Sequence, residues 1–178
     1  MQTSLANYWS QVLAQKVSVQ VVLAPATADV PRDCRDAVLV HTAFTCSSDD
    51  RVYVTAPYIA RLRSATPAAD VSYRFAATLG HEMGHVVQFA VHAPLVENDH
   101  PSAAQSQQIE QQADCLSGVW AAGVGLDMSR FIAAANEVFE LIDSDFERTL
   151  HGTPAVRIGA VERGANGASP HSCGLAAG

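Results

Sequence analysis

The strongest constraint on the fold is a pair of histidines four residues apart, His81 and His85, inside an apolar run with helical periodicity. Residues four apart lie on one face of an α-helix, with Cβ atoms about 6 Å apart. Both imidazoles can then reach a single ion at a metal–nitrogen distance of about 2.1 Å. The sequence therefore predicts a long central helix that begins at Thr66 and Pro67 and runs toward His92.

Three further residues of this helix carry information. Glu82 is rotated by about 100° from His81, so it lies beside an ion held by the two histidines and can contact a water molecule bound there. Gly80 and Gly84 each lower helix stability by about 1 kcal/mol relative to alanine. Their presence predicts that another part of the chain approaches this helix closely.

A second helix is predicted from Pro101 to about Gly123, and it carries Glu110 and Asp114 four residues apart. A zinc site that keeps one position open for water needs a third protein ligand, and Glu110 is the acid best placed to supply it. Asp114, one turn further on, can accept the free ring N–H of a ligating histidine and fix its tautomer. A solvated carboxylate on a glutamine-rich helix face is the alternative interpretation of Glu110.

The rest of the chain predicts an α+β fold. Three β-rich runs, at 17–24, 37–46 and 51–56, predict a small antiparallel sheet with a hairpin around 47–50. The sheet and further helices should pack on the central helix, with a cleft at the edge of the sheet. The further helices are expected over 3–15, 128–150 and 154–164.

The length of 178 residues fits one domain, which we expect to cover 1–164, with a flexible Gly/Ala/Ser-rich tail over 165–178. The net charge of -7 and the absence of a basic cluster exclude the usual electrostatic signature of nucleic-acid or anionic-lipid binding. No apolar run is long enough to span a membrane, and the start of the chain lacks the features of a signal peptide. Membrane contact is expected only through a leader or anchor removed from this sequence, and we expect a monomer.

Four cysteines, none in a CxxC pair, favour two disulfides in an oxidising compartment. Their alternating short and long spacing favours Cys34 with Cys46 and leaves Cys115 to hold the tail through Cys173. We therefore expect an extracytoplasmic protein, whether secreted, periplasmic or at the cell surface. Four reduced thiols in a cytosolic protein are the alternative.

The stretches HEMGHVVQ and IEQQADCLSGVWAAG resemble the bacterial putative neutral zinc metallopeptidase family. CRDAVLVHTAFTCSSDDRVYV and HGTPAVR are also similar to that family, so that the resemblance covers about 30–160 in patches. It implies a zincin-like fold and one Zn²⁺ ion, with peptides or proteins as substrates. For this chain it implies the ligands His81, His85 and Glu110, with Glu82 as the general base and Asp114 behind the ligands.

Hydrolysis of an amide also requires a donor for the oxyanion that forms beside the metal. His151 is the first candidate, with a helix-capping or solvated histidine as the alternative, and the weaker candidates are Tyr53, Tyr58 and Tyr73. The run RVYV at 51–54 is expected to pair with an extended peptide along an edge of the sheet. We do not expect a second ion site, because the spacing of the remaining acids and histidines is better explained by a solvated loop. These residues are His92, Glu97, Asp99 and His100.

The sequence thus predicts a zinc-dependent metallopeptidase in which Glu82 activates water. The alternative is a non-catalytic binding module on the same scaffold, with a structural or silent metal site. A structural zinc site has no need of a carboxylate beside an open coordination position, so Glu82 favours the enzyme.

Overall fold

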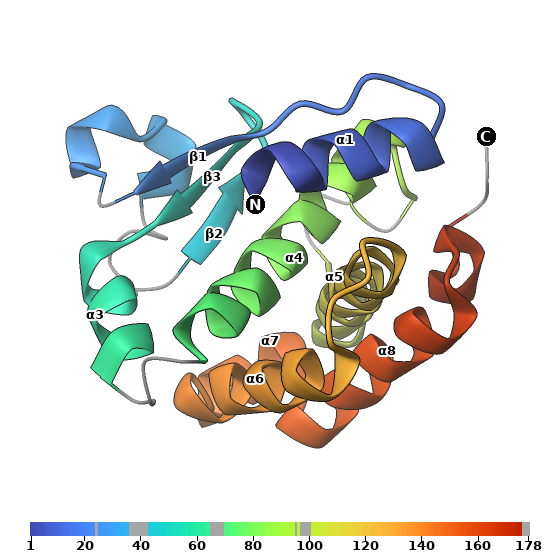
Figure 1. Cartoon of the computed structure of the whole chain (residues 1–178). Helices are drawn as coiled ribbons and strands as arrows, with labels where there is room; N and C mark the ends of the chain where they lie inside the picture. The colour runs from blue at the N-terminus through green and yellow to red at the C-terminus, as the bar shows by residue number, and fades with distance from the viewer. Residues whose placement is uncertain (24, 36–42, 65–69, 95, 97–100, 176–178) are drawn as a thin grey trace.

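The computed structural model describes residues 1–23, 25–35, 43–64, 70–94, 96 and 101–175. It has a mixed α+β architecture in which a small sheet lies on one side of the central helix α4 (Val71–Ala90) (Figure 1). The helices α5, α6 and α8 lie on the other side of α4, and α1 crosses over it (Figure 1). The expected α+β class is therefore confirmed.

The sheet has three strands in the order β1-β3-β2, namely β1 (Gln20–Leu23), β3 (Arg51–Val54) and β2 (Ala43–Cys46). The strands β2 and β3 form the predicted antiparallel hairpin, with Phe44 opposite Tyr53. The part of the expected second strand before residue 43 lies outside the described residues.

The expectation of a wholly antiparallel sheet is wrong, because β1 runs parallel to β3, with Val22 opposite Tyr53. The strand β1 occupies the side of β3 that the hairpin leaves open. Parallel pairing needs a connection of about a dozen residues or more, and the chain over 24–50 is long enough to supply it. The hydrophobic alternation of a strand does not fix its direction relative to a distant partner.

The helices on either side of α4 differ in part from those expected. The predicted 128–150 helix is interrupted at Ser144, whose side chain accepts a hydrogen bond from the Glu147 N–H and begins a new helix. The last helix starts at the predicted cap Thr153 and continues beyond Gly164. The bounds are α1 (Gln2–Val12), α3 (Ala56–Ser64), α5 (Ala103–Gly123), α6 (Met128–Leu141), α7 (Asp145–His151) and α8 (Pro154–Gly167).

Helix α3 was not expected from the sequence. It buries Tyr58 and Leu62, which lie four residues apart, and it places Arg61 and Arg63 in its last turn, where the helix dipole favours positive charge. The described part of α4 begins after Asp70, so the predicted start at Thr66 and Pro67 lies outside the described residues.

Both predicted cysteine pairs are brought to disulfide-bonding distance. Cys34 lies against Cys46, which ties the 3₁₀ helix Arg32–Cys34 to the end of β2. Cys115 of α5 lies against Cys173 of the 3₁₀ helix Pro170–Cys173. The division of the chain into a domain ending at 164 and a flexible tail stays a prediction.

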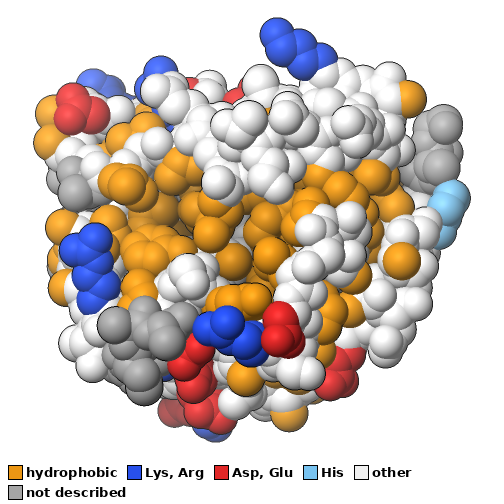
Figure 2. All heavy atoms as spheres, viewed as in Figure 1, with side chains coloured by type: hydrophobic (Ala, Val, Ile, Leu, Met, Phe, Trp, Pro, Cys, Tyr) orange, Lys and Arg blue, Asp and Glu red, His pale blue; other side chains and the backbone are white. Residues whose placement is uncertain are grey.

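On the face shown in Figure 2, hydrophobic side chains form a broad band across the middle of the molecule, while Lys and Arg side chains stand apart from one another. This arrangement agrees with the lack of a basic cluster in the sequence. In the part of the chain that the structure describes, no helix combines the length and apolar character required to cross a bilayer.

The helices α5 and α8 are in backbone contact at two glycines. An ideal Cβ on Gly164 would lie 1.9 Å from the Cys115 carbonyl oxygen, and one on Gly118 would lie 2.1 Å from the Val161 carbonyl oxygen. Neither distance is possible for a real side chain. The close approach of the two helices therefore depends on these two missing side chains.

Replacing Gly164 with alanine is expected to lower the free energy of unfolding by about 1–3 kcal/mol, because the new methyl group must separate α8 from α5. Gly159 provides a matched control in the same helix, since a Cβ there meets nothing within 4 Å. Gly159→Ala should leave the protein equally stable or stabilise it by up to about 1 kcal/mol. Urea unfolding of both variants measures the difference, and equal midpoints would contradict the close contact.

Candidate metal centre

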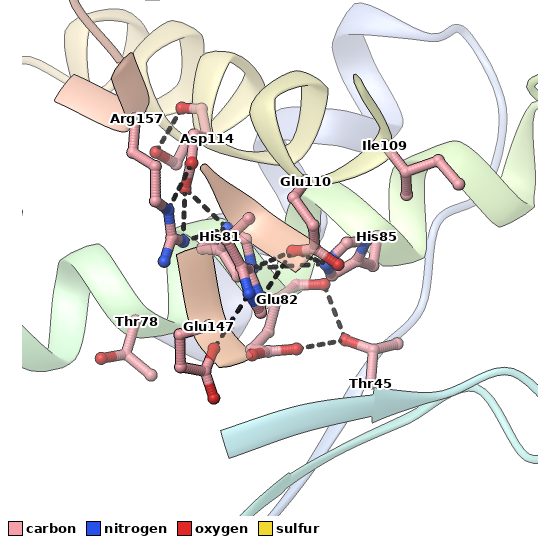
Figure 3. A network of polar contacts seen from close by, with 12 residues as sticks. Thr45, Thr78, His81, Glu82, His85, Ile109, Glu110, Asp114, Glu147 and Arg157 are labelled. Carbon is pink, nitrogen blue, oxygen red and sulfur yellow. Dashed lines mark hydrogen bonds and ion pairs between the residues drawn. The ribbon is translucent and has the colours of Figure 1, made fainter. Parts of the chain in front are cut away.

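His81 and His85 of α4 and Glu110 of α5 point toward one another between the two helices (Figure 3). Their nearest atoms form a triangle with almost equal sides. The two Nε2 atoms are 3.3 Å apart, and Glu110 Oε2 lies 3.2 Å from His81 Nε2 and 3.3 Å from His85 Nε2.

This triangle fits a tetrahedral zinc ion. Ligand atoms at about 2.0–2.1 Å from zinc stand about 3.3–3.4 Å apart at the corners of a tetrahedron. Glu110 Oε2 is also buried without a hydrogen bond of acceptable geometry among the described residues, although three histidines surround it. A buried carboxylate oxygen of this kind is explained by a cation. Together these three residues are able to hold one metal ion.

His81 is oriented by a buried acid. Its Nδ1 lies 2.7 Å from Asp114 Oδ1, and a carboxylate oxygen can only accept, so Nδ1 carries a proton and Nε2 is turned toward the triangle. Arg157 of α8 holds Asp114 in turn, donating from Nε to Oδ2 at 2.8 Å and from Nη2 to Oδ1 at 3.0 Å. The guanidinium also stacks on the Phe139 ring, 3.8 Å from its centroid. Asp114 therefore lies where the sequence analysis expects it.

His85 is oriented by Gln88. The Gln88 side-chain N–H donates to the Ile109 carbonyl oxygen at 2.9 Å, and that oxygen can only accept, so the amide has one orientation. The amide oxygen of Gln88 then faces His85 Nδ1 at 2.8 Å. Nδ1 must donate this hydrogen bond, which leaves the lone pair of Nε2 free for an ion.

Glu82 lies beside the triangle on the side of the sheet (Figure 3). Its Oε2 is 2.8 Å from Thr45 Oγ1 of β2, and the same hydroxyl lies 2.9 Å from the Glu82 carbonyl oxygen. A hydroxyl that donates to Oε2 leaves the other carboxylate oxygen available. Glu82 is thus near the ligands without being one of them.

His151, at the end of α7, reaches the triangle from the opposite side. Its Nε2 lies 3.1 Å from Glu110 Oε2, and its Nδ1 lies 2.9 Å from Glu147 Oε2. Two of the tyrosines named as weaker candidates are engaged elsewhere, since Tyr53 donates to Asp49 at 2.6 Å and Tyr73 lies under the Arg130 guanidinium. The third, Tyr58, is buried against Thr78 in a small cavity behind Glu82.

A cleft of 580 Å³ opens at this centre. Its lining includes Phe44 and Thr45 of β2 and Phe146 and Leu150 of α7. The expectation that the run 51–54 pairs with a peptide is wrong. This run is β3, which lies between β1 and β2 and therefore has no free edge. Among the described residues, β2 is the strand with an unpaired edge at the cleft.

Gly80 and Gly84 of α4 face α5, the helix that carries Glu110. An ideal Cβ on Gly84 would lie 2.7 Å from both the Ala113 Cα and its carbonyl oxygen, and one on Gly80 would lie 3.1 Å from Ser117 Cβ. The predicted close approach to the central helix is therefore confirmed. It brings Glu110 within reach of the two histidines.

A family model described as putative neutral zinc metallopeptidase matches residues 3–175. The chain belongs to this family. It matches no curated protein and no solved structure. Membership in the zinc metallopeptidase family agrees with the donor set of two imidazoles and a carboxylate, and it implies peptides or proteins as substrates.

The charges behind the ligands determine their protonation in the metal-free protein. Burial raises the pKa of Asp114, but the positive charges of Arg157 and His81 outweigh it and hold that pKa at about 2. Burial lowers the pKa of His81, but the charge of Asp114 and the hydrogen bond to it raise that pKa to about 10. His81 is therefore protonated at neutral pH without a metal, and a metal ion bound there would have to displace this proton.

The same balance applies on the other side of the triangle. Burial raises the pKa of Glu110, but the nearby His85 and His151 outweigh it and lower that pKa well below its usual range. Burial lowers the pKa of His151, but the charge of Glu110 raises it to about 9. In the metal-free protein Glu110 is therefore ionised and His151 is protonated at neutral pH.

Four residues around the centre were missed by the sequence analysis: Thr45, Gln88, Glu147 and Arg157. Arg157 is 4% exposed and follows the spacing of the buried residues Ala160, Val161 and Gly164 of α8. An arginine in a buried helical position needs an ionised partner, so this pattern is a usable signal. Of the acids and histidines considered for a second ion, Glu97, Asp99 and His100 lie outside the described residues, and His92 is exposed.

Proposed function

We propose that this protein is a zinc-dependent peptidase that hydrolyses peptide bonds with Glu82 as the general base. The observation that carries the proposal is the triangle of His81, His85 and Glu110, which matches one face of a zinc tetrahedron and opens into a cleft. Glu82 is the carboxylate beside that opening. One Zn²⁺ ion is enough for this donor set.

Bound at the triangle, zinc would supply Lewis acidity to a water molecule and to the substrate carbonyl. Glu82 accepts the proton of the attacking water on the carboxylate oxygen that Thr45 does not hold. It then passes this proton to the leaving amine. The Thr45 hydroxyl keeps the carboxylate in place during both transfers.

His151 donates a hydrogen bond to the oxyanion that develops on the substrate. Its position next to Glu110 places Nε2 at the rim of the centre, and Glu147 Oε2 lies 2.9 Å from Nδ1 on the other side of the ring.

An extended peptide pairs with the free edge of β2 and lies between β2 and α7. Backbone groups of an edge strand are the usual means of holding a peptide in extended form. The apolar lining from Phe44, Phe146 and Leu150 contacts its side chains. The two cysteine pairs support an extracytoplasmic location for this activity.

Removal of zinc is expected to abolish cleavage. Treatment with a chelator should reduce the hydrolysis of casein or of a peptide mixture to background, and one equivalent of Zn²⁺ should restore it. Metal analysis of the restored protein should give one zinc per chain. Cleavage by the metal-free protein would contradict the proposal, and one bound zinc without any cleavage would favour the binding module.

A further inference from the structure

A second cleft, of 480 Å³, lies beside the metal centre where α4 ends. It shares the lining residues Phe89 and Val96 with the cleft at the metal, so the two clefts adjoin. Ser47, which follows directly after β2, also lines it. The strand edge that borders the metal centre therefore leads into this second cleft.

The chain that leaves α1 and runs back toward β1 (Figure 1) contributes Lys16, Val17 and Ser18 to the lining of this second cleft. Gln15 fixes this segment to α4, since its side-chain amide donates to the Ala90 carbonyl oxygen at 3.2 Å. The next residue, Lys16, lines the second cleft. Its place relative to the metal centre is thus set by the end of α4.

Lys16 is the only lysine in a chain with a net charge of -7. It is exposed, and within the described ranges its amine has neither a hydrogen bond nor an ion pair, even though Asp50 lines the same cleft. His92 adds a third titratable group to this wall. An unpaired ammonium in a cleft attracts a carboxylate, and the low-dielectric walls of the cleft focus that attraction.

We propose that the second cleft binds an acidic side chain of a peptide substrate through Lys16. The proposal rests on the peptidase function above and gives it a substrate preference. Phe89, which lines both clefts, lies one helical turn, about 6 Å, beyond His85. An extended peptide advances about 3.3 Å per residue, so the acidic residue lies two or more residues from the cleaved bond.

Peptides that differ only by Glu or Gln at one position test this preference. The zinc-loaded parent is expected to cleave the Glu peptide about two to five times faster, as kcat/KM, at a position two or more residues from the bond. Lys16→Gln should bring the ratio close to one, while Lys16→Arg should keep it. Asp50→Asn removes the neighbouring negative charge and should raise the ratio.

An equal effect of Lys16→Gln on the Glu and Gln peptides would overturn the proposal, and so would a parent that prefers acid at no position. A measurement of peptide affinity distinguishes failure of the Lys16 proposal from failure of the peptidase proposal. Zinc-loaded parent and Lys16→Gln protein are titrated with fluorescent forms of both peptides, and zinc-loaded Glu82→Gln protein is used if cleavage is too fast. A Glu preference in affinity that Lys16→Gln removes supports the second cleft even if nothing is cleaved, and equal affinities contradict it.

Discussion

Replacing Glu82 with glutamine is expected to lower kcat for peptide hydrolysis by about 10²–10⁴-fold while zinc remains bound. The amide has nearly the same shape as the carboxylate and can still meet Thr45, but it cannot accept the proton of the attacking water. Glu82 does not belong to the ligand triangle, so the metal content should stay at one ion per chain. Steady-state kinetics and metal analysis of the purified variant measure the two effects.

The control is Glu162→Gln, which removes an exposed carboxylate of α8 and should leave both kcat and zinc content unchanged. Equal rates for the parent and Glu82→Gln would remove Glu82 from the mechanism. Loss of zinc from the variant would instead show that this residue helps to hold the ion, which contradicts its place beside the ligands.

Replacing Arg157 with methionine is expected to lower the free energy of unfolding of the metal-free protein by about 3–5 kcal/mol. Methionine fills similar space over Phe139 but removes both hydrogen bonds that Arg157 donates to Asp114, and it leaves that fully buried carboxylate with His81 as its remaining cation. A buried carboxylate that loses two charge-assisted hydrogen bonds carries a large desolvation penalty. Urea unfolding in the presence of a chelator measures the change without a contribution from bound metal.

Two comparisons show whether burial is the cause. Arg148→Met breaks an exposed pair with Asp143 and should change stability by no more than about 1 kcal/mol. The double variant Arg157→Met with Asp114→Asn removes both buried charges and should recover part of the lost stability. Additive effects of the two single changes would mean that the buried pair is not coupled.

The candidate site could be predicted to the extent that local spacing determines it. His81 with His85, and Glu110 with Asp114, are pairs four residues apart, and helical periodicity alone places each pair on one face. Their convergence depends on the packing of α4 against α5, for which Gly80 and Gly84 were the visible signal. Whether these residues act as proposed is for the experiments above to decide.

The contacts that orient the ligands were not predictable in this way. Arg157 is 43 residues from Asp114 in the sequence, and no local pattern joins them. Gln88 and Thr45 are ordinary polar residues until the fold places them beside His85 and Glu82. Such pairings result from tertiary packing, which a single sequence does not reveal.

The fold shows the same division. Most of the helices and their positions could be predicted from hydrophobic periodicity and from capping residues such as Thr153 before α8. The break before α7 had a local signal that was overlooked, namely Ser144 three residues before Glu147. The parallel direction of β1 had none, because strand alternation is identical for both directions.

Gly84 has a consequence for the choice of metal. The backbones of α4 and α5 touch at Gly84 and Ala113, and the three donor atoms are carried by these same two helices. Any side chain at position 84 would push the two helices apart and enlarge the donor triangle, which would weaken its fit to zinc with bonds of about 2.0–2.1 Å. The separation of the three donor atoms thus depends on a residue that is not one of them.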